Sequence, residues 1–176
     1  MKVVQGLLPN DYKLQVQEVL LGNSFPWNWN KGTVEPKDEK VFQLTHVFAF
    51  EDVIYSDYFN VVEPMFYYIK QSTGIEAKSS HRIKANLLPR QVCDDQDIAK
   101  LIHKDTGGDN HTSFIYYLHD VDGDIKTYDK DYKVTDQYEP KENSLVWFKS
   151  NTLHGTRPPI QEKRRVCINF VLETHD

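Results

Sequence analysis

Two histidines and an aspartate stand at spacings that could hold a metal ion. His103 and Asp105 are separated by one residue in the stretch LIHKDTGG, and side chains at positions i and i+2 of an extended backbone point to the same face. His154 comes 51 positions after His103, close behind a strand-like run that ends in WFKS. Two neutral imidazoles and one carboxylate are the facial ligand set that holds ferrous iron and leaves positions open for dioxygen. These three residues therefore predict a non-haem iron centre.

A pair of arginines indicates a second ligand beside this metal. Arg164 and Arg165 begin the run RRVCINFVL, which is otherwise apolar and typical of a buried strand. A buried arginine that met no anion would carry a large desolvation cost. A carboxylate of a small cosubstrate can be that anion, because the planar guanidinium binds carboxylates through two parallel hydrogen bonds.

The elements that must position these residues are two helices followed by a series of short strands. Apolar spacing predicts a helix over residues 14–21 and a second over about residues 57–71, which Pro64 would kink or split. Helices first and strands later favour a mainly β fold, a sandwich or barrel backed by helices. The expected strands, rich in β-branched and aromatic residues and separated by turn residues, are residues 82–88, 112–119, 124–129, 144–149 and 165–172, with an earlier one over 41–50.

Composition limits the classes of protein to which the chain can belong. Its 176 residues are 39% apolar and 12% aromatic, which is enough for one globular domain with a buried core. No run approaches the roughly 18–20 apolar residues of a membrane span, and the first residues lack the apolar stretch of a secretory signal, so we expect a cytoplasmic protein. The net charge of −5 argues against a nucleic-acid binder. Two cysteines are too few for a disulfide framework or a cysteine-rich zinc site.

The order of these features resembles the iron(II)- and 2-oxoglutarate-dependent dioxygenases, most closely their prolyl-hydroxylase-like branch. The motif His103-x-Asp105, the run SFIYYLH, the run SLVWFKSNTLH ending at His154, and the run RRVCINF follow one another in the family's order. The resemblance covers about residues 82–173 and implies a double-stranded β-helix, a jelly-roll or cupin-like barrel of two sheets with helices on one side.

The resemblance also implies how the chain is organised. Residues 1–176 would form a single dioxygenase domain, with N-terminal helices and substrate-side loops over residues 1–80 and the catalytic β-helix over residues 81–176. Short stand-alone enzymes of this kind occur in bacteria and their viruses. His103, Asp105 and His154 match the family's three iron ligands.

One arginine matches the family's anchor for the distal carboxylate of 2-oxoglutarate. We assign Arg165, because strand alternation then turns Arg165, Cys167 and Asn169 into the barrel and leaves the larger apolar residues for the helices. Arg164 is the alternative, since a β-bulge would exchange the two.

Two further residues are expected at the cosubstrate. Tyr117 matches a tyrosine that in related enzymes donates its hydroxyl to the cosubstrate carboxylate, whereas Tyr116 would face the opposite way and pack. Asn86 lies on a strand from which some relatives contact 2-oxoglutarate, and a structural role is equally open. Leu88 stands where many prolyl-hydroxylase relatives carry a tyrosine, so the polar contacts of the pocket should differ from theirs.

The implied activity is oxidative decarboxylation of 2-oxoglutarate coupled to hydroxylation of a substrate. Fe(II) is the expected metal, 2-oxoglutarate the cosubstrate and ascorbate a candidate reductant. Peptidyl proline, a free amino acid and a small metabolite all stay open as substrates, and the pattern does not distinguish oligomeric states.

Two other functions stay open. An AlkB-like nucleic-acid demethylase would share the chemistry, but residues 1–80 carry seven lysines and no arginine against ten acidic residues, which disfavours it. A non-catalytic β-sandwich that binds metal or carbohydrate could use Trp27 and Trp29 as its platform. These tryptophans could equally line the mouth of a barrel or cover the end of its core. The other histidines, expected at the surface or as capped groups, are His46, His81, His111, His119 and His175.

Overall fold

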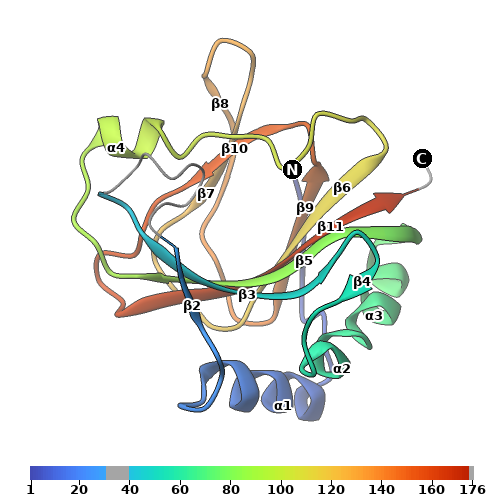
Figure 1. The fold of residues 1–176 in the computed structure, drawn as a ribbon. Coiled ribbons are helices and arrows are strands. Elements are labelled where there is room, and N and C mark those ends of the chain that lie inside the picture. The colour runs from blue at the N-terminus through green and yellow to red at the C-terminus, as the bar shows by residue number, and fades with distance from the viewer. Residues whose placement is uncertain (31–39, 175–176) are drawn as a thin grey trace.

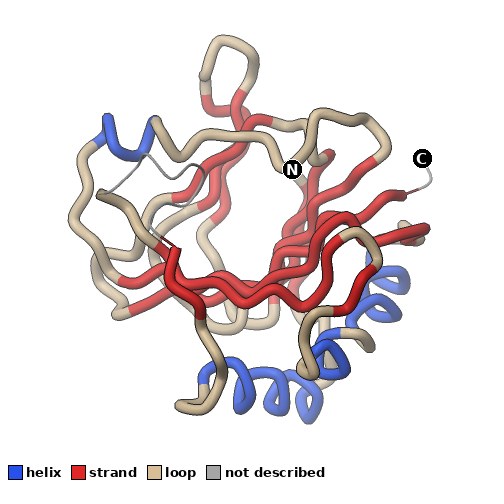
Figure 2. Tube along the Cα trace, viewed as in Figure 1, coloured by secondary structure: helices blue, strands red, loops and turns tan. Residues whose placement is uncertain are grey.

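Two antiparallel sheets surround the middle of the molecule (Figures 1 and 2). The protein is described here by a computed structural model over residues 1–30 and 40–174. In spatial order, the larger sheet of the described residues contains β1 (Lys2–Gln5), β9 (Ser144–Lys149), β6 (His111–Tyr117), β11 (Arg164–Thr174), β5 (Ala77–Pro89), β3 (Gln43–Phe50) and β2 (Asn28–Asn30), with β4 (Val53–Ile54) paired to β3. The smaller sheet contains β10 (Leu153–Thr156), β7 (Ile125–Tyr128) and β8 (Val134–Tyr138). The predicted mainly β, jelly-roll fold is confirmed.

Three helices cover the outer face of the larger sheet (Figure 1). They are α1 (Asn10–Leu21), α2 (Phe59–Val62) and α3 (Met65–Thr73), while α4 (Asp95–Ala99) lies on the far side beside β10. Pro64 was expected to kink or split the helix predicted over residues 57–71, and the structure shows the split. α3 ends at Gly74, whose φ of 73° is left-handed and costs a glycine little because it has no Cβ.

The main core lies between these helices and the sheet. Val166, Ile168 and Phe170 of β11 point to this side and have no exposed surface. Phe170 packs edge-on against Phe66 of α3, with ring centroids 5.8 Å apart. Full burial of an aliphatic or aromatic side chain contributes roughly 1.5–3 kcal/mol, so this face of β11 is a main source of stability.

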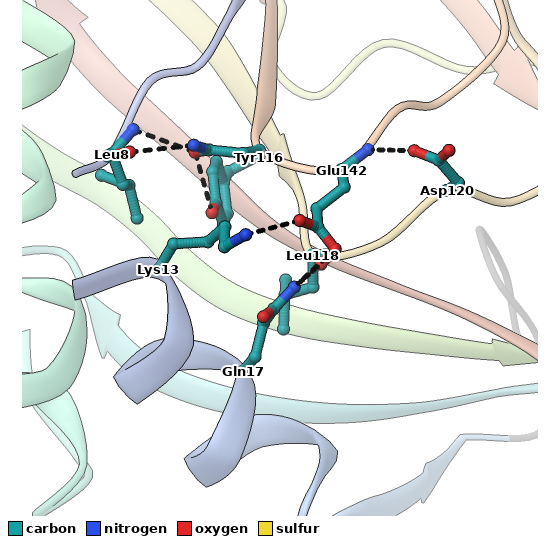
Figure 3. A network of polar contacts seen from close by, with 8 residues as sticks. Leu8, Lys13, Gln17, Tyr116, Leu118, Asp120 and Glu142 are labelled. Carbon is teal, nitrogen blue, oxygen red and sulfur yellow. Dashed lines mark hydrogen bonds and ion pairs between the residues drawn. The ribbon is translucent and has the colours of Figure 1, made fainter. Parts of the chain in front are cut away.

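A polar network attaches α1 to the ends of β6 and β9 (Figure 3). Lys13 Nζ lies 2.6 Å from Glu142 Oε1, and Gln17 Nε2 donates to the carbonyl oxygen of Leu118 at 2.5 Å. The backbone N–H of Glu142 donates in turn to Asp120 Oδ1 at 2.6 Å. These bonds connect the helix to two loops of the barrel and fix where it lies along the sheet.

The strands that the pattern missed are mostly short, polar edges. β1 and β8 expose nearly every residue and carry no apolar alternation. β8 pairs with β7, which turns the charged stretch after residue 129 into one arm of a hairpin. Among the described residues, no helix is both long enough and apolar enough to cross a membrane.

Candidate active site

The structure brings His103, Asp105 and His154 together where the two sheets meet. His103 and His154 form an isolated antiparallel bridge, in which each backbone N–H donates to the other's carbonyl oxygen at 2.9 Å. His154 Nε2 lies 3.6 Å from Asp105 Oδ2, and His103 Nε2 lies 3.9 Å from Asp105 Oδ1. The potential ligand atoms of the three residues all lie within 4.8 Å of one another.

Both imidazoles are oriented by backbone carbonyls. Nδ1 of His103 lies 2.9 Å from the carbonyl oxygen of Leu101, and Nδ1 of His154 lies 3.0 Å from that of Thr152. Since a carbonyl can only accept, each Nδ1 carries the proton, and each Nε2 keeps its lone pair toward Asp105. Burial, and next the neighbouring His154, lower the pKa of His103 to about 4. His103 is therefore neutral at physiological pH, which is the state a metal ligand needs.

Asp105 is held by two side chains besides the histidines. Arg82 Nη2 lies 2.6 Å from Oδ1, and Ser113 Oγ donates to Oδ2 at 2.7 Å. Burial alone would raise the pKa of Asp105, but His154, Arg82 and the Ser113 hydrogen bond together lower it to about 2. The carboxylate is thus ionised and fixed in orientation.

This donor set fits ferrous iron. Two imidazole nitrogens and one carboxylate are the 2-His-1-carboxylate set that leaves coordination positions open, and hydrogen bonds from outer groups to the ligands are the usual support of such a site. All three residues border one cavity of about 80 Å³. A metal bound there would therefore face a space that small molecules can enter.

The same cavity extends to a buried arginine. Arg165 is 6% exposed, and its Nη1 donates to the carbonyl oxygens of Gly123 at 2.9 Å and Arg157 at 3.4 Å, and to Thr156 Oγ1. All of these acceptors are neutral, Nε has no partner, and no carboxylate among the described residues forms an ion pair with this guanidinium. The residues present therefore fit an anionic group brought by a ligand.

The cavity also contains the other residues that the sequence placed there. Tyr117 is fully buried; burial raises the pKa of its hydroxyl, whereas the nearby Arg165 acts to lower it. Asn86 borders the cavity, and its Oδ1 has no hydrogen-bond partner. Arg164 lies outside, exposed, and donates to the carbonyl oxygen of Leu21. Tyr116 packs in the main core.

The tryptophans and the remaining histidines lie elsewhere. Trp27 packs edge-on against Phe25 at 4.9 Å, and Trp29 is 60% exposed beside Phe42. Neither tryptophan is among the described residues that line the cavity. His46 is the capped rather than the surface alternative: it is buried, and its two ring nitrogens are hydrogen-bonded to the carbonyl oxygen of Pro26 and to Ser56 Oγ. His175 lies outside the described residues.

Sequence reasoning missed three polar residues of this region. Arg82 and Ser113 hold Asp105, and Lys84 borders the cavity between them and Asn86. A signal for two of them existed: the resemblance indicated Asn86, and i, i+2 alternation places Lys84 and Arg82 on the same face of that strand.

Comparison with known proteins gives a family match over part of the chain and a fold. Residues 93–172, slightly less than half of the chain, match the model of the 2OG-Fe(II) oxygenase superfamily. A comparison with curated proteins found no match. A prolyl-4-hydroxylase from Pseudomonas putida has a similar structure, with a TM-score of 0.63 and 15% identity over 98% of this chain and 91% of that one.

Two further solved structures share the fold. An oxidoreductase of the 2OG-Fe(II) oxygenase family from Burkholderia pseudomallei has a TM-score of 0.65 at 10% identity, covering 97% of this chain and 82% of its own. A prolyl hydroxylase from Trichoplax adhaerens, in complex with a fragment of hypoxia inducible factor, has a TM-score of 0.59 at 13% identity, covering 98% and 83%. At these identities the likeness establishes the fold.

Proposed function

We propose that this chain is an Fe(II)- and 2-oxoglutarate-dependent dioxygenase that hydroxylates an aliphatic carbon of a small molecule or peptide. The match of residues 93–172 to the 2OG-Fe(II) oxygenase superfamily supports this activity. One observation carries the proposal. The cavity that the two imidazoles and the carboxylate border also reaches a buried guanidinium that lacks an anionic partner among the described residues. A site for a metal alone would not need that arginine, whereas a site for a metal and a dicarboxylate needs both the three metal ligands and the arginine.

In this proposal His103, Asp105 and His154 bind the metal. Bound together there, ferrous iron and 2-oxoglutarate supply the oxidation: dioxygen gives one oxygen atom to the substrate carbon and one to succinate, with release of carbon dioxide. Arg82 and Ser113 keep the carboxylate of Asp105 oriented, and the backbone carbonyls keep both Nε2 atoms pointing inward.

Arg165 and Tyr117 bind the distal carboxylate of 2-oxoglutarate. The two residues lie on the neighbouring strands β11 and β6, and Tyr117 pairs in register with Cys167, two positions after Arg165. The buried guanidinium supplies two parallel hydrogen bonds and the phenol supplies a third. Asn86, whose Oδ1 has no partner, is a further cosubstrate contact in this proposal.

Apolar side chains close the cavity around these polar groups. Leu88, Leu101, Ile115 and Ile125 are all among its lining residues. They limit the entry of water, which strengthens the electrostatic contacts of the ligands inside.

The substrates to test are those on which proteins of this fold act, together with other small molecules. Two of the structures with the same fold are prolyl hydroxylases, and one of them is bound to a peptide. Peptidyl proline, a free amino acid and a small metabolite are therefore the substrates to test. The acidic N-terminal part gives no support to a nucleic-acid demethylase.

Coupled turnover is the first test of this function. The protein is purified without oxygen and given Fe(II), ascorbate and 2-oxoglutarate, and succinate is measured with each substrate class added. Binding of Fe(II) and of 2-oxoglutarate is measured separately by calorimetry under nitrogen, because turnover without substrate is slow. Binding of neither ligand contradicts the proposal, and binding of metal without 2-oxoglutarate favours the non-catalytic β-sandwich.

Variants assign the roles. We expect His103→Ala and Asp105→Ala to lose metal binding, whereas Arg165→Ala keeps the metal and weakens 2-oxoglutarate by about 2–5 kcal/mol, roughly 30-fold or more. Arg164→Ala is the matched control on the opposite face and keeps both affinities. If Arg165→Ala binds 2-oxoglutarate normally and Arg164→Ala does not, the anchor is Arg164.

A further inference from the structure

One positive charge in the cavity has no role in the proposed reaction. Lys84 lies on β5, faces inward and borders the cavity together with His103 and Asp105. Its ammonium takes part in none of the hydrogen bonds and ion pairs that the described residues form. Burial, and next the charge of Arg82, lower the pKa of Lys84 to about 8, so the side chain is still mostly charged at neutral pH.

The other charges around Lys84 already have counterparts. Arg82 forms an ion pair with Asp105 at 2.6 Å. Arg165 is assigned to the distal carboxylate of 2-oxoglutarate, and the metal to the remaining carboxylate of that cosubstrate. When the metal and 2-oxoglutarate are bound, Lys84 is therefore the cation among the described cavity residues that has no counter-ion. Because a partly buried charge without a counter-ion is costly, the arrangement favours a second anion close to the metal.

An unsatisfied acceptor lies directly beside this lysine. Asn169 of β11 pairs in register with Lys84 of β5, so the two residues are direct cross-strand neighbours on the cavity face. Side chains in such a pair start about 4.5–5.5 Å apart at Cβ, and both can therefore reach one small molecule. Asn169 is 7% exposed, and its Oδ1 has no hydrogen-bond partner. A cation and a free acceptor side by side match a molecule that carries a carboxylate next to an ammonium.

We propose that Lys84 and Asn169 bind a free α-amino acid as the substrate, with the ammonium of Lys84 on its carboxylate and Oδ1 of Asn169 accepting from its amino group. This inference rests on the proposed function and narrows its substrate class. A residue inside a peptide would offer Asn169 an amide N–H but would offer Lys84 only a neutral carbonyl, so the charge of Lys84 would have no counter-ion.

Binding of amino acids to the loaded protein tests the inference. The protein is saturated with Mn(II) and 2-oxoglutarate under nitrogen, which prevents turnover, and titrated calorimetrically with each of the common free L-amino acids. Every amino acid that binds is then compared with its carboxamide and with its N-acetyl derivative. We expect at least one free amino acid to bind at least 10-fold more tightly than either derivative.

Two variants and a control locate the contacts. Lys84→Met should weaken the free amino acid at least 10-fold and leave its carboxamide unchanged, while the affinity for 2-oxoglutarate stays as in the wild type. Asn169→Leu should remove the preference for the free amino group over the N-acetyl form. Lys78→Met, an exposed lysine on the same strand, should change none of these affinities. Circular dichroism confirms that each variant is folded, and Lys84→Gln replaces Lys84→Met if the latter is not.

The outcomes that overturn the inference differ from those that overturn the function. If metal and 2-oxoglutarate bind but no free amino acid is preferred over its derivatives, the amino-acid site is wrong and the oxygenase stands. If Lys84→Met weakens 2-oxoglutarate 10-fold, Lys84 belongs to the cosubstrate site instead. If the wild type binds neither metal nor 2-oxoglutarate, the proposed function itself is wrong.

Discussion

The two faces of the larger sheet carry different chemistry on the same strands. On the outer face of β11, Val166, Ile168 and Phe170 pack against helices with no exposed surface. On the inner face of the same strand, Arg165 and Asn169 border the cavity. Every second residue of one strand therefore contributes to packing, and the alternate ones present polar atoms to a space that the protein does not fill.

This difference separates stability from ligand binding. Arg165 Nε, Asn169 Oδ1 and Asn86 Oδ1 are all buried and without a hydrogen-bond partner. A buried polar group left unsatisfied costs about 1–3 kcal/mol, and none of the apolar residues on the outer face carries such a cost. The inner face presents polar atoms whose hydrogen bonds a ligand could complete, and the outer face supplies stability that offsets their cost.

The largest expected effect is on the outer face. Phe170→Ala removes a fully buried ring that packs on Phe66, and such truncations cost about 3–5 kcal/mol because a cavity is left behind. Urea unfolding of the metal-free protein measures the loss.

Arg165→Met is the matched change on the inner face of the same strand. It removes a buried charge and three hydrogen bonds to neutral acceptors but fills nearly the same volume. We expect the free energy of unfolding to change by no more than about 1 kcal/mol. An equal loss from both variants would show that the inner face also carries the stability of the fold.

The next effect is on metal affinity. Ser113→Ala removes the hydroxyl that donates to Asp105 Oδ2 at 2.7 Å, and loss of such outer support lowers metal affinity roughly 10–100-fold. Competition with a chelator measures it. Ser144→Ala is the control, since this buried hydroxyl bonds to the carbonyl oxygen of Lys141. A Ser113→Ala protein with wild-type metal affinity would mean that Arg82 alone orients the carboxylate.

The sequence predicted the site residues best where strand alternation and side-chain chemistry indicate the same face of a strand. In β11 the apolar face has to pack against the helices, so strand alternation predicted that Arg165 points into the cavity. Arg164 lies outside the cavity. The spacing of His103 and Asp105 likewise indicated a shared face, and the structure brings both to His154.

The sequence predicted least where contacts join distant strands. β1 pairs with β9, almost the whole chain apart, and its exposed residues give no periodic signal. Arg82 contacts Asp105 across the barrel, and nothing local to either residue indicates that pairing. Such contacts depend on strand order and register, which a single sequence does not encode in its spacing.

The inner face should also make stability depend on pH. The pKa of His103 is lowered to about 4 in the folded protein, against about 6.5 in an unfolded chain. Between these values the unfolded chain binds a proton that the folded protein does not, so stability falls as the pH falls through this window. The imidazole is 32% exposed, so we expect a moderate loss of about 1–2 kcal/mol between pH 7 and pH 4.5.

A variant isolates this contribution. Urea unfolding of metal-free His103→Gln at the same two pH values should show a shallower loss than the wild type. Asp105 adds its own loss only at lower pH, because its folded pKa is about 2. Equal slopes for the wild type and His103→Gln would mean that other groups cause the acid sensitivity.

The smallest expected effect is again on the outer side, in the polar network that attaches α1. Lys13 and Glu142 lie 2.6 Å apart, but the glutamate is 42% exposed, and ion pairs in contact with water contribute only about 0.2–1 kcal/mol. A double-mutant cycle of Lys13→Met and Glu142→Gln measures the coupling, which should shrink as salt is added. Metal affinity should not change in either variant. A coupling above about 2 kcal/mol would mean that polar attachment rivals apolar packing in holding α1, and the division between a polar inner face and an apolar outer one would no longer describe how this sheet is stabilised.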